Sequence, residues 1–112
     1  MAERQTDIRY HKLKISIEYF QDVKLGLKKY EIREYTGRDF RIGDRLVLYC
    51  PDLFCPYLVT SPINYMLYDS DFPGIAASYV VLSFEEAEVR SDSEIDNLPD
   101  NWVEVEPLIK GE

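Results

Sequence analysis

The chain has 112 residues, of which 46% are hydrophobic and 13% aromatic, and its formal net charge is −8 at pH 7. This length and composition predict one folded domain and exclude an intrinsically disordered chain. No apolar run approaches the roughly 18 residues that a membrane span needs, and the first residues lack the apolar segment of a signal peptide. We therefore expect a cytoplasmic protein that does not enter a membrane.

The charge is distributed unevenly along the chain. Residues 1–48 carry 11 Lys and Arg against 8 Asp and Glu, whereas residues 49–112 carry 2 against 13. Broad binding to duplex DNA needs an extended basic surface, which this distribution argues against. It leaves room for a local anion-binding site in the first half.

The first elements follow from two changes of period. Residues 11–17 alternate between apolar and polar, with Lys14 on the polar face, which predicts a half-buried strand. From Ile17 onward the apolar residues recur at three-to-four spacing, which predicts a short helix. Ser16 is expected as its N-cap, and Gly26 as the residue that ends it at positive φ.

Residues 28–35 alternate again and predict a second strand. Tyr30 and Ile32 share one face of it, and Glu31 and Arg33 share the other. If the first pair faces the core, the second pair is an ordinary solvated ion pair on the surface. Alternatively, the charged face is the floor of a binding site.

The rest of the chain reads as further strands and turns. Strands are expected at 45–50, at 57–68, where Pro62 favours an edge position or a bulge, and at 77–84, which is apolar enough to be buried on both faces. The order of one strand, one helix and then several strands predicts an α+β fold. We divide the chain into an N-terminal extension (1–10), a domain (11–84) and an acidic C-terminal extension (85–112), in which a final strand is expected at 102–109.

Two cysteines, Cys50 and Cys55, flank a turn-like segment. A zinc site needs about four ligands, and the chain adds only His11 to these two. We therefore expect neither a metal nor another cofactor. Free thiols and a disulfide are both open, and a cytoplasmic location favours free thiols.

Several segments, taken in order and spacing, resemble the ASCH-domain proteins, in particular the DUF3850 branch. The segments are HKLKI, YFQDVKLGLKKYEIR, GRDFRIGDRLVL, INYMLY and YVVLSF, within residues 11–84. The resemblance implies a small PUA-like mixed β-barrel with one or two short helices and a cleft beside the first helix. It also implies that the domain binds RNA or a nucleotide-like ligand.

The resemblance offers an enzymatic alternative as well. Some ASCH proteins are small amidohydrolases that act on acetylated cytidine, and others are reported as ribonucleases. The catalytic Lys of the amidohydrolases corresponds to Lys28, which would act as the base, with Glu31 as the acid. However, Glu31 stands where those enzymes carry a nucleophilic Thr, and the loop before Arg38 is one residue longer than in the family pattern. The first difference argues against this hydrolase activity, and the second implies a loop of different shape over the cleft and a different ligand.

The candidate ligand-binding residues surround the predicted helix end and the following loop. Lys28 would contact a phosphate, Arg33 would offer a planar set of donors, and Glu31 would accept from an amine of a base. His11 is either structural or bonded to the Glu31 cluster, and Tyr19 is either a core residue or a stacking residue. The remaining candidates are Lys14, Arg38 and Asp39.

Alternative roles exist for these loop residues and for the whole chain. Asp39 either contributes to the site or pairs with Arg38 or Arg41 and stiffens the loop. Phe40 is expected to fill the core beneath that loop. A third hypothesis for the chain is a protein-interaction module that uses the acidic C-terminal region or a tyrosine-rich edge.

Overall fold

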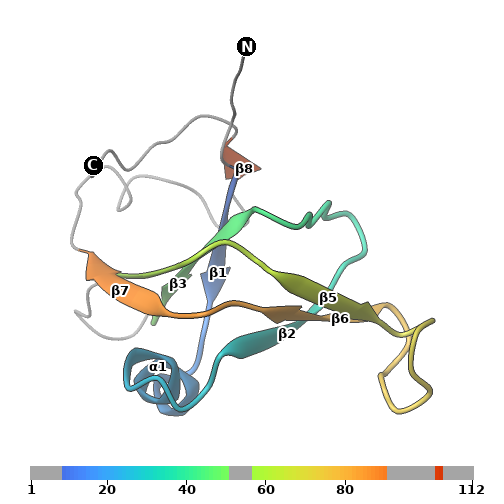
Figure 1. Cartoon of the computed structure of the whole chain (residues 1–112), viewed down its shortest axis with the longest axis horizontal. Coiled ribbons are helices and arrows are strands. Elements are labelled where there is room, and N and C mark those ends of the chain that lie inside the picture. The colour runs from blue at the N-terminus through green and yellow to red at the C-terminus, as the bar shows by residue number, and fades with distance from the viewer. Residues whose placement is uncertain (1–8, 51–56, 91–102, 105–112) are drawn as a thin grey trace.

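The computed structural model of the chain describes residues 9–50, 57–90 and 103–104. Most of the ordered elements are strands, and among the described residues there is one α-helix, α1 (Ile17–Lys24). The strands are β1 (Tyr10–Lys14), β2 (Tyr30–Glu34), β3 (Arg45–Tyr49), β4 (Tyr57–Thr60), β5 (Tyr65–Tyr68), β6 (Tyr79–Ser83), β7 (Ala87–Arg90) and β8 (Val103–Glu104). The architecture is α+β, as the element order predicts (Figure 1).

The strands form two sheets. One is a five-stranded mixed sheet in the order β7-β4-β3-β1-β8, in which β1 and β3 run parallel and all other neighbours antiparallel. The other is a three-stranded antiparallel sheet in the order β2-β6-β5. The resemblance implied a barrel, but the strands described here form two separately hydrogen-bonded sheets that do not close into one.

Two bends join the sheets. The predicted strand over 57–68 is divided at residues 61–64 into β4 in the larger sheet and β5 in the smaller, and β6 continues into β7 through residues 84–86. The bends are bonded to each other: the amide of Ser61 donates to the carbonyl of Glu86 at 2.8 Å, and the amides of Glu85 and Glu86 donate to Ser61 Oγ at 2.9 and 3.0 Å. Pro62, which cannot donate to a ladder, marks one of these bends.

Helix α1 begins and ends where the sequence predicts. Ser16 is its N-cap with an extended backbone, and Gly26 follows the C-cap residue with a φ of +80°. The amide of Leu27 donates to the carbonyl of Asp22 at 2.9 Å, which is the long hydrogen bond of a Schellman turn. This turn reverses the chain toward β2 and brings Lys28 to the start of that strand.

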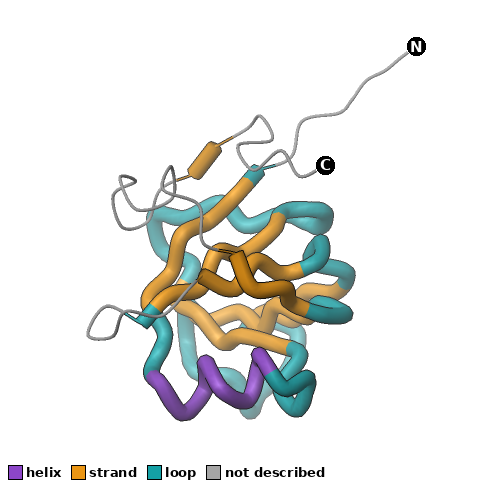
Figure 2. Tube along the Cα trace, turned by 90° about the vertical axis from the view of Figure 1, so that its left-hand side faces the viewer, coloured by secondary structure: helices purple, strands orange, loops and turns teal. Residues whose placement is uncertain are grey.

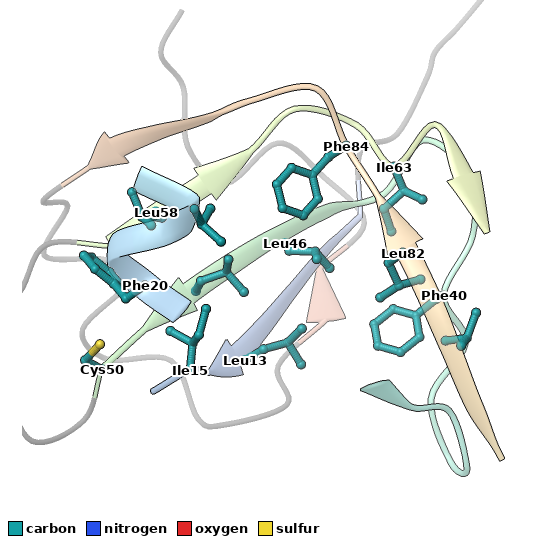
Figure 3. Packing of buried hydrophobic residues seen from close by; sticks show 13 residues of the cluster. Leu13, Ile15, Phe20, Phe40, Leu46, Cys50, Leu58, Ile63, Leu82 and Phe84 are labelled. Carbon is teal, nitrogen blue, oxygen red and sulfur yellow. The ribbon is translucent and has the colours of Figure 1, made fainter. Parts of the chain in front are cut away.

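A single hydrophobic cluster lies between the helix and the two sheets. Helix α1 contributes Phe20 and Val23, and it lies at one end of the strands (Figures 2 and 3). Phe40 belongs to this cluster, which confirms its expected place beneath the loop, and Cys50 is buried in the same cluster. The full set is Leu13, Ile15, Phe20, Val23, Phe40, Leu46, Leu48, Cys50, Leu58, Ile63, Val80, Leu82 and Phe84.

Burial corrects two of the strand predictions. All of β1 except Lys14 is buried, including Lys12 on the face expected to be polar, where its Nζ lies 5.0 and 5.6 Å from the ring centres of Tyr49 and Tyr57. By contrast, β6 is not buried on both faces: Val80 and Leu82 are buried, whereas Tyr79 is exposed. A run of apolar residues does not reveal which face another element covers.

Candidate functional site

Strand β2 turns its charged face inward. Glu31 is buried and Arg33 is half-buried, while Tyr30 and Ile32 on the other face are exposed. The interpretation in which Tyr30 and Ile32 face the core is therefore wrong. Glu31 and Arg33 are not a solvated surface pair, and they lie beside α1.

Glu31 is held by cations on both sides. Lys28 Nζ donates to Glu31 Oε2 at 2.5 Å, and Arg33 donates to Glu31 Oε1 from Nε at 3.0 Å and from Nη2 at 2.8 Å. The side chains of Glu31, Lys28 and Arg33 are 5%, 12% and 24% exposed. Charge-assisted bonds at partly buried positions fix the carboxylate in one orientation. Lys28 is therefore not a plain exposed lysine.

Further bonds tie this cluster to the surrounding backbone. Arg33 Nη2 also donates to the carbonyl of Lys14 at the end of β1, at 2.5 Å, and Lys28 Nζ donates to the carbonyl of Tyr30 at 2.6 Å. The Lys14 side chain is exposed. Arg33 thus joins the end of the larger sheet to the edge of the smaller one.

Two adjoining hollows lie around the cluster, between α1 and β2. One of about 230 Å³ is lined by Tyr19, Lys28, Tyr30, Glu31 and Ile32. The other, of about 320 Å³, is lined by Lys14, Ile15, Ser16, Tyr19, Glu31, Ile32 and Arg33. Both share Tyr19, Glu31 and Ile32, and we call the combined depression the α1–β2 cleft. Tyr19 is 55% exposed and forms a cleft wall, with Lys28 Nζ 5.1 Å from its ring centre.

The backbone of β2 contributes to the cleft as well. Among the described strands β2 pairs only with β6, so its other edge is open toward α1. The amide of Tyr35 donates to the carbonyl of Ser78, so the odd-numbered residues of β2 direct their backbone groups to β6. The N–H and C=O of Ile32 therefore point into the cleft, on the side where Lys28 reaches the Tyr30 carbonyl.

His11 lies in a different cluster. It is fully buried, its Nε2 lies 2.8 Å from Asp44 Oδ2, and its ring packs on Phe40 with centroids 4.6 Å apart. Arg38 Nη1 lies 3.4 Å from His11 Nδ1, which assigns the acceptor role to Nδ1 and the N–H to Nε2. His11 thus bonds to Asp44 rather than to Glu31, and it is not among the residues that line the cleft.

Arg38 and Asp39 are neighbours in the loop after β2, but their side chains make different contacts. Arg38 is half-buried over the ring of Phe40, and burial together with the neighbouring Arg33 guanidinium lowers the pKa of Arg38. Arg38 therefore lies near enough to Arg33 for their charges to interact. Asp39 is exposed and accepts from Arg41 Nη2 at 2.7 Å, so it pairs within the loop and lies outside the cleft.

The cleft lies within a segment that matches a known family model. Residues 10–84, about two thirds of the chain, match the model of a domain of unknown function, DUF3850. The chain belongs to the DUF3850 family. No curated protein matches it. Because the match runs from β1 to the end of β6, the whole α1–β2 cleft is part of the DUF3850 domain.

Sequence reasoning missed several parts of the site in this DUF3850 domain. Asp44 is not among the candidate residues from the sequence, yet it is buried and accepts from the Arg41 amide at 2.9 Å as well as bonding to His11. The backbone of Ile32 was missed because an open strand edge has no signature in side-chain type. For Asp44, a signal was present: a lone His and a Gly-Asp turn in one domain are natural partners.

Other chemistry was sought in the same part of the chain. Within residues 9–50 and 57–90, no three His, Cys, Asp or Glu side chains lie close enough together to hold a metal ion. None of the helices described is long and apolar enough to cross a membrane. The pairing state of Cys55, and most of the strand expected at 102–109, lie outside the described residues.

Proposed function

We propose that this domain binds RNA or a modified nucleotide in the α1–β2 cleft. The observation that carries the proposal is the buried carboxylate of Glu31, fixed between Lys28 and Arg33 at the base of a hollow with an aromatic wall. A carboxylate, two cations and a ring placed together match the amine, phosphate and planar surface of a nucleotide.

Each group in the cleft retains capacity for a ligand. An ionised carboxylate has about four acceptor positions, and Glu31 Oε2 receives one bond from Lys28. The bonds from Arg33 use Nε and Nη2, so its Nη1 carries further donors for a phosphate or a carbonyl. Arg38, whose charge interacts with Arg33, adds positive potential on the same side.

The open backbone of Ile32 suits a nucleobase. Its N–H and C=O form a donor and an acceptor side by side, which is the pattern that the amide-like edge of a base also presents. Tyr19 would stack on the face of the base. The two hollows, of about 230 and 320 Å³, lie near the lower end of the roughly 300–1,000 Å³ of a drug-sized site, which favours one nucleotide over a long polymer footprint.

We extend the proposal to the wider relationship implied by the sequence. The motif order resembles ASCH-domain proteins, and we propose that the two bent sheets are a variant of the PUA-like arrangement. The bends around Pro62 and Glu86, through which β4–β5 and β6–β7 each serve both sheets, support this proposal.

The test is a titration of isotope-labelled protein with nucleosides, nucleoside monophosphates and short single-stranded RNAs at low salt. We expect amide shifts at Lys28, Glu31 and Ile32 and a saturable curve. Arg33→Ala should weaken the phosphorylated ligands more than the nucleosides. Arg41→Ala, which removes an exposed arginine paired with Asp39 outside the cleft, is the matched control. Titrations without shifts along β2 would refute the proposal.

The same samples also test the hydrolase alternative. Lys28 is engaged as a hydrogen-bond donor to a carboxylate and a carbonyl, whereas a general base uses the lone pair of its amine as an acceptor. Both oxygens of Glu31 already receive bonds. We therefore expect no turnover of N4-acylated cytidine or RNA. Turnover that disappears in Lys28→Ala would instead identify an enzyme.

A further inference from the structure

The second face of the three-stranded sheet is exposed and apolar. In β5 and β6 the inward residues Met66, Tyr68, Val80 and Leu82 belong to the core or pack against it, so their neighbours point outward. In β2 the inward residues are those of the cleft. The apolar residues that point outward, here called the outer face, are Tyr30, Ile32, Tyr65, Leu67, Tyr79 and Val81.

The register places these side chains in two adjacent rows. Ile32 pairs with Val81, which pairs with Leu67. Tyr30 and Tyr65 both pair with the small residue Ser83, which leaves a shallow trough between their rings. Tyr65 is 59% and Ile32 52% exposed. A contiguous patch of this kind on a small domain is typical of an interaction site.

The exposed charged residues at the outward positions around the outer face are acidic, whereas Lys28, whose Nζ lies 4.7 Å from the ring centre of Tyr30, borders the same face and is paired with Glu31. Continuing the alternation, the outward positions at the strand ends are Glu34 on β2, Asp69 after β5 and Glu85 after β6. Glu34 and Glu85 are exposed, and Asp69 is half-buried. No Lys or Arg of β2, β5 or β6 points to this side, because Arg33, the one basic residue in these strands, points into the cleft.

We propose that the outer face binds a short basic amphipathic helix of a partner protein. Three strands span about 10 Å, which equals the diameter of one α-helix. An apolar stripe on the helix would lie along Ile32, Val81 and Leu67. Lys and Arg beside that stripe would meet Glu34 and Glu85. Of the outer face, Tyr30 and Ile32 also line the α1–β2 cleft, whereas the residues of β5 and β6 do not.

Two other occupants fit less well. A second copy of the chain would bring the exposed glutamates Glu34 and Glu85 of both copies together. Single-stranded RNA could stack bases on the tyrosines, but its phosphates would lie near Glu34 and Glu85. The charge of the border therefore selects a basic partner.

The probe is a synthetic helical peptide of about two heptads with leucine on one face and lysine on its flanks. Its controls are a scrambled peptide of the same composition, in which no apolar stripe forms, and a peptide with glutamate in place of lysine. Binding is followed by amide shifts of the labelled full chain. We expect saturable shifts along β5 and β6, and weaker binding of both control peptides.

Variants of the outer face distinguish binding of the peptide at this surface from a general attraction of a basic peptide to an acidic protein. Tyr65→Ser and Leu67→Thr should each weaken the helical peptide about tenfold. Val89→Thr, which changes an exposed apolar residue on β7 in the other sheet, should leave the affinity unchanged. Circular dichroism establishes that each variant is folded, and nucleotide titrations show whether the α1–β2 cleft is unaffected by them.

Three results would overturn the proposal. The first is equal affinity for the helical and scrambled peptides, which would mean that only net charge is recognised. The second is a dimer in sedimentation experiments that Tyr65→Ser abolishes, which would assign the face to a second copy. The third is nucleotide-induced shifts at Tyr65, Leu67 and Val81, which lie on the outer face and do not line the cleft. None of these depends on whether nucleotides bind in the cleft.

Discussion

Glu31 lies on the interior side of β2 even though its neighbours are more apolar, and its three partner bonds explain why this is tolerated. A buried carboxylate is costly unless it is paired and hydrogen-bonded. Here Lys28 and Arg33 supply both the charge and the donors, and the Lys14 carbonyl anchors Arg33 in turn. Lys28 and Arg33 thus stabilise the buried carboxylate and are also available to contact a ligand.

This arrangement predicts the effect of neutralising the carboxylate. Glu31→Gln keeps the shape but leaves Lys28 and Arg33 without their counter-charge, so we expect the free energy of unfolding to fall by about 2 kcal/mol. Urea unfolding measures this change. Glu34→Gln, an exposed position on the same strand, should change it by less than about 0.5 kcal/mol. Equal effects of the two substitutions would show that Glu31 is not held as described.

Asp69 offers a second prediction at this scale. The backbone amide of Ser78 and the hydroxyl of Tyr35 donate to it, at 2.8 Å each, and hold the pKa of Asp69 below its ordinary value of 3.8. Because the folded-state pKa is lowered, Asp69 contributes stability above the unfolded-state pKa, and this is lost as the pH falls through the folded-state value. Its partner Tyr35 has a raised pKa, chiefly because it donates to Asp69.

Removing the tyrosine hydroxyl should therefore shift this titration. In Tyr35→Phe the Ser78 amide remains, so we expect the pKa of Asp69 to move up toward 3.8 without exceeding it. The carboxyl-carbon resonance of Asp69, followed by NMR between neutral and acidic pH, measures the midpoint. Tyr65→Phe, on the outer face of the same sheet, is the control and should not move it. An unchanged midpoint in Tyr35→Phe would argue that the hydroxyl does not act on Asp69 in solution.

At the scale of elements, the sequence predicts which residues of a strand or helix share a face. It does not predict whether that face points to the core or to solvent. The spacing around Ser16 and Gly26 is enough to place α1, because caps and positive φ are local properties. The alternation in β2 correctly groups Glu31 with Arg33. It does not say that the apolar pair would be outside, since that depends on α1 being short and on the outer face lacking a cover.

The division of residues 57–68 into two strands has the same origin. Pro62 signals an edge or a bulge, but the change of sheet depends on hydrogen bonds to Glu85 and Glu86, which are distant in sequence. Contacts of this kind are not encoded in a local pattern. The resemblance to a family supplied the cleft beside the helix, which spacing alone could not.

The bends between the sheets can be tested through Ser61. Its hydroxyl accepts from the amides of Glu85 and Glu86, and both would lose this partner in Ser61→Ala. We expect the free energy of unfolding to fall by about 1–2 kcal/mol, because each such hydrogen bond contributes roughly 1 kcal/mol. Thermal or urea unfolding measures this loss. Ser70→Ala, at an exposed loop position, should leave the free energy of unfolding unchanged. A decrease of similar size in Ser70→Ala would show that the hydrogen bonds of Ser61 do not specifically stabilise the bend.

At the scale of the whole molecule, the charge distribution restricts how a nucleic acid can bind. Three basic residues of the first half are used in internal pairs: Lys28 and Arg33 with Glu31, and Arg41 with Asp39. The second half is strongly acidic. A ligand would therefore meet a small region of positive potential around Arg33, surrounded by a negative molecule.

This distribution predicts a weak dependence of binding on salt. If two phosphates are contacted, the affinity for a short single-stranded RNA should fall roughly sevenfold between 50 and 200 mM salt, because the slope is about −0.7 for each contact. A protein with an extended basic surface would lose a factor of about 10³ or more over the same range. Fluorescence anisotropy across this salt series measures the slope, with Arg33→Ala reducing it by about one contact. A slope that corresponds to six or more phosphate contacts would require a binding surface outside the α1–β2 cleft. It would contradict a site that recognises one nucleotide by shape and hydrogen bonding.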